Sequence, residues 1–154
     1  MASRTTVKGL ADKLGDPDDG SVELEEEEVR LAAAALLVQA TAVDGQVVWR
    51  ERQALHDILE RGFELDQLQV RQLVTQADEK EKKKVDLHGI TGVLTKKLNK
   101  EDRMKVLEML FEVINADGVI HDEEGKFALR VEQSLGVTSH DWAKMRMNKE
   151  DRDA

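Results

Sequence analysis

Apolar residues recur along this chain at the three- and four-residue spacing that is typical of helices. The most apolar stretch is residues 31–43, where only Gln39 and Thr41 are polar. A helix that is apolar on nearly every side is usually buried at the centre of a fold. No segment alternates apolar and polar residues for long enough to form a strand. The pattern therefore predicts an all-α protein with one central helix.

About seven helices are expected, because Gly, Asn, Asp and Thr residues mark helix ends at regular intervals. They cover residues 24–43, 49–61, 65–78, 86–98, 100–115 and 122–135, followed by a short helix capped by Thr138. Gly62 is expected to end the second helix, and Leu68 to face inward in the third. Gly89 and Gly92 inside the fourth would be explained by close helix contact or by a break. Residues 79–84, EKEKKK, form a charged joint or a solvated helix end.

Three segments follow from this pattern. Residues 1–22 contain several Gly and Asp residues and little periodicity, which predicts a flexible tail. Residues 23–147 are the helical domain, and residues 148–154 form a polar C-terminal tail. A chain of 154 residues has enough length to bury one core of ordinary size.

The central apolar segment occurs twice, in residues 31–51 and 104–124. Each copy is an apolar helix, an Asp-Gly corner and a glutamate seven residues after the aspartate. Equivalent positions are 73 residues apart, which pairs Asp44 with Asp117 and Glu51 with Glu124. A fixed offset that holds for several residue types indicates an internal repeat of two related halves.

Two interpretations of the corners remain open. In the first, each corner has a purely structural role, as a turn that holds two helices together. A glutamate in the first turn of a helix is favoured by the helix dipole, and an aspartate before glycine is a common turn residue. The aliphatic residues Val47 and Ile120 would then anchor the corners in the core.

In the second interpretation the corners bind a cation. An EF-hand loop is improbable, because its first ligand positions would be Ala40 and Ala42 in one copy and Val113 in the other. A site shared between the halves would instead present only oxygen ligands, which suit Ca²⁺, Mg²⁺ or Mn²⁺. Its main ligands would be Asp44, Glu51, Asp117 and Glu124, with Asn115, His121, Asp122 and Glu123 as additional candidates. Arg50 and Arg52 flank Glu51 and could neutralise it internally.

Charge and composition exclude several classes of function. The net charge of −9 and a pI near 5.0 argue against nucleic acid or anionic lipid as a main partner. There is no cysteine, so disulfides and thiolate chemistry are excluded. Residues 31–38 are the longest apolar run and too short to span a bilayer, and no signal peptide is visible. These features fit the cytoplasm. No nucleotide-binding or catalytic motif occurs, so we expect no enzymatic activity.

The sequence resembles the tellurite-resistance protein B (TerB)-like family, and within it a small stand-alone bacterial branch. The segments that carry the resemblance are LAAAALLVQA (31–40), AVDGQVVWRE (42–51), NADGVIHDEE (115–124) and SLGVTSHDW (134–142), within residues 24–147. The resemblance implies an all-helical fold of two halves, no known enzymatic activity, and a role in bacterial stress systems such as tellurite resistance. It also implies metal binding through Asp44, Glu51, Asp117 and Glu124. Val43 and the Trp49-Arg50 pair depart from the family pattern.

Together these observations predict a non-enzymatic, TerB-like domain that binds or senses a divalent cation in the bacterial cytoplasm. The alternative is a helical interaction module with purely structural corners. Its surface would bind a protein partner or a second copy of the chain.

Overall fold

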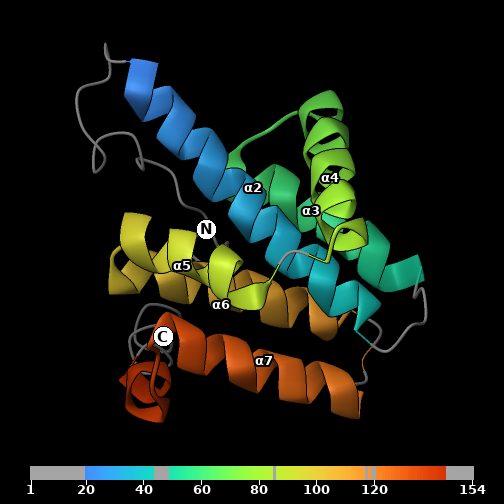
Figure 1. The fold of residues 1–154 in the computed structure, drawn as a ribbon. Coiled ribbons are helices and arrows are strands. Elements are labelled where there is room, and N and C mark those ends of the chain that lie inside the picture. The colour runs from blue at the N-terminus through green and yellow to red at the C-terminus, as the bar shows by residue number, and fades with distance from the viewer. Residues whose placement is uncertain (1–19, 44–48, 85, 117, 119–120, 145–154) are drawn as a thin grey trace, which may run out of the picture.

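The computed structural model describes residues 20–43, 49–84, 86–116, 118 and 121–144, and every structural statement below refers to these residues. All regular structure in them is helical (Figure 1), which confirms the predicted fold class. The complete helices are α2 (Gly20–Ala42), α3 (Trp49–Phe63), α4 (Gln67–Lys82), α5 (Leu87–Lys97), α6 (Lys100–Ile114) and α7 (Asp122–Leu135). A further helical segment covers residues 139–144.

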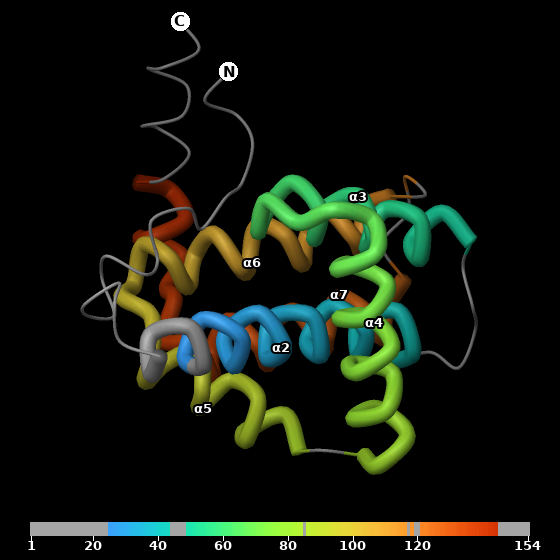
Figure 2. Tube along the Cα trace, turned by 90° about the horizontal axis from the view of Figure 1, so that it is seen from above, coloured from blue at the N-terminus to red at the C-terminus, as the bar shows by residue number. Residues whose placement is uncertain are grey.

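Helix α2 is the centre of the fold. It contacts α3, α4, α5, α6 and α7 (Figure 2), and residues 32–38 are buried without interruption. This confirms the prediction from its apolar sequence, because such a helix is stable only where neighbours cover it on every side. The helix begins at Gly20, so it extends into the predicted N-terminal tail. The rest of that tail, and residues 148–154, lie outside the described part of the chain.

Helix α3 does not end at Gly62, contrary to the prediction. Gly62 is buried inside the helix, which continues to Phe63, and the chain turns at Glu64 with a φ of 55°. A residue with positive φ ends a helix by leaving the right-handed region, a role that glycine usually fills. Glutamate is not a residue type that signals a helix end, which explains why the sequence pointed to Gly62 instead.

The buried side of α4 also differs from the prediction. Its buried residues follow the helical repeat and are Val70, Leu73, Val74 and Ala77. Leu68 precedes Val70 by two residues, which places it on the opposite face, and it is 64% exposed. The helix extends to Lys82, so most of the charged run 79–84 is a solvated helix end and not a joint.

Reciprocal hydrogen bonds fix the start of two helices. At α4, the backbone N–H of Gln69 donates to Asp66 at 2.8 Å, and the N–H of Asp66 donates to the Gln69 side chain at 2.9 Å. The segment 139–144 begins in the same way, with Thr138 and Asp141 bonded at 3.1 and 2.9 Å. The bond from Thr138 and an ion pair with Lys100 lower the pKa of Asp141 to about 2. Such capping boxes satisfy backbone donors that a helix leaves open.

The internal repeat is visible in the order of helices. Helices α2, α3 and α4 have α6, α7 and the segment 139–144 as their counterparts, and α7 begins 73 residues after α3. Both third helices begin with one of the capping boxes just described. The contacts between the halves also correspond: α3 packs on α6 of the other half, and its counterpart α7 packs on α2. The duplication therefore covers three helices in each half.

Helix α5 contains two exposed glycines, a residue type that is unfavourable inside a helix. Gly89 and Gly92 lie within a continuous helix, and a Cβ built on either would have nothing within 4 Å. Neither close helix contact nor a break in the helix therefore explains them.

Replacing Gly92 with alanine is expected to raise the free energy of unfolding by about 0.5–1 kcal/mol, because alanine restricts the unfolded chain and fits the helix. Denaturant unfolding would measure the change. Gly136→Ala is the matched control and should destabilise the protein, since Gly136 ends α7 with a φ of 70°. An unchanged or lower stability of the Gly92 variant would contradict the prediction.

Candidate cation site

The helix ends that flank both Asp-Gly corners lie at the same end of the molecule. Helices α2 and α6 run in the same direction, and α3 and α7 return from the end where α2 and α6 stop (Figures 1 and 2). We call this the corner end, defined by the last turns of α2 and α6 and the first turns of α3 and α7. The repeat thus brings the helix starts that carry Glu51 and Glu124 to one end of the fold.

Glu51 and Glu124 occupy equivalent places at the corner end. Each is the third residue of its helix, in α3 and in α7, and each is only 1% exposed. The sequence predicted their position in the first turn but not their burial. Asp44 and Asp117, the other two predicted main ligands, lie outside the described residues, as do Val47 and Ile120.

Hydrogen bonds at the second corner involve two of the additional candidates. The backbone N–H of His121 donates to Oε1 of Glu124 at 3.4 Å, which is long for such a bond. Asn115 follows α6, and its side chain donates to the carbonyl oxygen of Phe111 at 3.0 Å. In this arrangement the Asn115 amide turns back onto its own helix.

The remaining two candidates, Asp122 and Glu123, are exposed in the first turn of α7. Glu123 lies 3.5 Å from the ammonium group of Lys126. An exposed ion pair of this kind contributes little to stability. Their carboxylates are accessible to solvent, in contrast to that of Glu124.

At the first corner, Arg52 pairs with a residue that the sequence analysis did not identify. Its guanidinium donates to both carboxylate oxygens of Asp78 in α4, at 3.2 and 3.0 Å. The Arg52 guanidinium is thus directed to α4, and Arg50 is exposed; that either arginine neutralises Glu51 stays a prediction. Asp78 carries no local signal, because it follows Arg52 by 26 residues in the sequence.

Two titratable groups respond to the environment of this pair. Burial lowers the pKa of His56, and the nearby charge of Arg52 lowers it further. Burial raises the pKa of Glu81, and the carboxylate of Asp78 adds to the increase. Burial disfavours the charged form of each group, so both shifts have the expected sign. The contact between α3 and α4 therefore combines one ion pair of two hydrogen bonds with partly buried titratable neighbours.

Within the described residues, no three His, Asp or Glu side chains are grouped closely enough to hold a metal ion. Of the four main ligands predicted, this part of the chain contains only the two glutamates. A search of the described helices also finds none that is long and apolar enough to cross a membrane.

These features define a class of protein: an all-α domain of two related helix–corner–helix halves, each with a buried glutamate after its corner. The family model for the tellurite resistance protein TerB matches residues 30–147. The chain belongs to the TerB family, as its resemblance indicated. Comparisons with curated proteins and with solved structures find no match.

Proposed function

We propose that this protein is a non-enzymatic TerB domain that binds a divalent cation at its corner end, in a bacterial stress response such as tellurite resistance. The main ligands in this proposal are Asp44, Glu51, Asp117 and Glu124. Carboxylate oxygens are the ligands that Ca²⁺, Mg²⁺ and Mn²⁺ prefer, so the donor set fits these ions. Such a domain would sense or buffer the cation, and no step of bond chemistry is required of it.

The observation that carries this proposal is the burial of Glu51 and Glu124 at equivalent positions of the two halves. Removing a carboxylate from water is costly unless an opposite charge or several hydrogen bonds offset the loss. A bound cation supplies such a charge. Both halves have a buried carboxylate at the same helix position, which supports the proposal that the two carboxylates serve the same purpose.

A capping box does not by itself require burial. In α4, Gln69 completes a capping box while it is exposed, through bonds of 2.8 and 2.9 Å. Glu124 is buried, yet its bond from the His121 N–H is longer, at 3.4 Å. A third buried first-turn carboxylate, that of Asp102 in α6, lies 3.6 Å from the ammonium group of Lys105. At Asp102, the buried carboxylate therefore has a positive charge close by.

The same bond from His121 favours the second candidate function. A carboxylate that accepts the backbone N–H of the preceding cap residue stabilises the helix start without any ion. In that case the corners are structural, and the protein is a helical interaction module whose surface binds a partner or a second copy.

Removing one carboxylate distinguishes the two functions. We expect the unchanged protein to bind Ca²⁺, Mg²⁺ or Mn²⁺ with a Kd below about 0.1 mM, within the range of protein calcium sites. Glu124→Gln should weaken that binding about tenfold or more, by analogy with the loss of residues that support metal ligands. Calorimetric titration of metal-free protein would measure both values.

Glu101→Gln is the matched control. Glu101 is also a first-turn glutamate, but it is exposed and lies in α6 at the opposite end of the bundle (Figure 1). Its replacement should leave cation affinity unchanged. A protein that binds none of the three ions, and in which Glu124→Gln changes only the melting temperature, would support the interaction module instead.

A further inference from the structure

We propose that residues 139–144 form a releasable strap on α6, which opens while the six complete helices stay folded. The strap is the helical segment that Thr138 caps. Its Trp142 ring meets the ring of Phe111 in α6 edge to face, with centroids 5.5 Å apart. Opening would uncover Phe111, and it does not depend on the proposed cation site.

The strap is less deeply buried than its counterpart α4 in the first half. The two helices begin at equivalent capping residues, Asp66 and Thr138. Four residues after its cap, α4 has Val70, which is only 1% exposed, while the strap has Trp142, which is only partly buried. No residue of 139–144 is fully buried. Because burial of apolar surface is what mainly holds a short helix on its neighbours, the strap is held less firmly than α4.

The contact with α6 also leaves two hydrogen-bond donors buried and unpaired. Nε of Arg103 in α6 and Nε1 of Trp142 have no acceptor among the described residues. Arg103 uses another guanidinium nitrogen to donate to the carbonyl oxygen of Leu135, where α7 ends, at 2.7 Å. A buried donor without an acceptor has lost its hydration without compensation, and it recovers that hydration when water reaches it. Opening would return water to the Trp142 indole, which lowers the free energy that opening costs.

The ion pair between the strap and α6 is open to solvent. The Asp141 carboxylate lies 3.1 Å from the ammonium group of Lys100, whose side chain is 51% exposed. An exposed pair of this kind contributes little, and salt screens it. The bond that Asp141 accepts from the Thr138 N–H, at 2.9 Å, lies within the strap's own cap and does not involve α6. In the described residues, α6 therefore holds the strap by one screened ion pair and one aromatic contact.

Hydrogen exchange tests whether the strap opens alone. The backbone N–H of Trp142 donates to the carbonyl oxygen of Thr138 at 3.1 Å, and a short helix loses such bonds once its tertiary contacts are gone. We expect the Trp142 amide to be protected at least about 100-fold less than those of Leu110 in α6 and Val131 in α7, because buried helices exchange only through larger openings. Exchange followed by NMR on the full chain would measure all three.

Two variants test whether α6 is what holds the strap closed. Asp141→Asn removes the charge that pairs with Lys100 and keeps an acceptor for the cap, so it should speed exchange at Trp142 roughly two- to fivefold. Phe111→Leu removes the ring contact and should speed it roughly three- to tenfold. Glu123→Gln is the control, because it removes an exposed ion pair within α7 and should leave exchange at Trp142 unchanged.

Fluorescence gives a second measurement of opening. Trp49→Phe leaves Trp142 as the only tryptophan, and Trp49 is 74% exposed, so its replacement should not disturb the fold. On heating, the Trp142 emission should shift to longer wavelength before far-UV circular dichroism reports the loss of the helices.

Three outcomes would overturn the strap. In the first, the Trp142 amide exchanges as slowly as those of Leu110 and Val131. In the second, the emission of Trp142 changes only together with the circular dichroism, so the segment belongs to the cooperative bundle. In the third, exchange at Trp142 is fast but neither Asp141→Asn nor Phe111→Leu alters it, which would describe a frayed chain end that α6 does not hold. None of these measurements requires a bound ion, so they are independent of the proposed function.

Discussion

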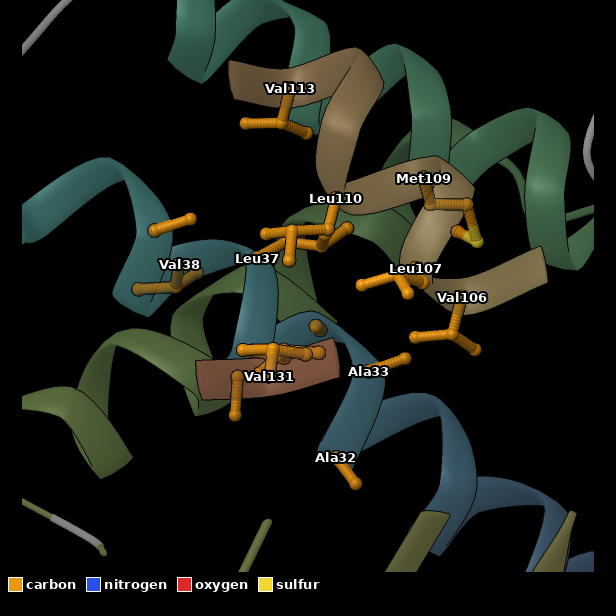
Figure 3. Packing of buried hydrophobic residues seen from close by; sticks show 14 of the residues in the cluster. Ala32, Ala33, Leu37, Val38, Val106, Leu107, Met109, Leu110, Val113 and Val131 are labelled. Atoms are coloured by element: carbon orange, nitrogen blue, oxygen red, sulfur yellow. The ribbon is translucent and has the colours of Figure 1, made fainter. Parts of the chain in front are cut away.

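Replacing Leu37 with alanine is expected to lower the free energy of unfolding by about 2–5 kcal/mol. Leu37 is fully buried in α2, the helix that contacts all the other complete helices. Figure 3 shows its side chain pointing toward Leu110, where α2 packs on α6. The substitution removes apolar contacts and leaves a cavity. Side chains on several helices would have to move to fill it. Denaturant unfolding would measure the loss.

Leu68→Ala provides the control, because it deletes the same atoms from a leucine that is 64% exposed. We expect it to change stability by no more than about 0.5 kcal/mol, as is usual for surface substitutions. Equal losses for the two variants would show that Leu37 is not in the core as described.

Enlarging Ala33 to leucine is expected to destabilise the protein by about 1–3 kcal/mol. Ala33 is fully buried, and Figure 3 shows it on the side of α2 that faces Val106 and Leu107. The small side chain allows the two helices to approach closely, so a larger one must adopt a poor rotamer or push α6 away. Thermal or denaturant unfolding would detect the change.

Ala42→Leu is the matched control on the same helix. Ala42 is the last residue of α2 and is exposed, so three extra carbons there meet solvent. Its stability should stay close to that of the unchanged protein. A neutral result at Ala33 as well would mean that the core contains unfilled space beside α2.

Local signals made most of the fold predictable from the sequence. The starts of α3, α6 and α7 were predicted at the residues where they occur, because caps and first-turn acids are features of a few neighbouring residues. The burial of α2 followed from its composition alone. The errors at Gly62 and Leu68 have a different origin. Whether a glycine ends a helix, and which face is covered, depends on helices that are distant in the sequence.

The candidate site was predictable only in part. The 73-residue repeat singled out Glu51 and Glu124, and the structure places both helix starts at one end of the molecule. Their burial depends on the packing of both halves, which periodicity does not contain. The partner of Arg52 could not be chosen either, because the chain has 32 acidic residues and only the α3–α4 contact selects Asp78.

The central place of α2 has a consequence for how the duplicated chain unfolds. A repeat of two three-helix units suggests that one half could melt while the other persists. However, α2 belongs to the first half and packs against α5, α6 and α7 as well as its own neighbours. Losing either half would expose a helix that is apolar on nearly every side, at a large cost in hydration free energy. The repeat is therefore visible in the sequence and in the arrangement of the helices, but we expect the described bundle of complete helices to unfold as one cooperative unit.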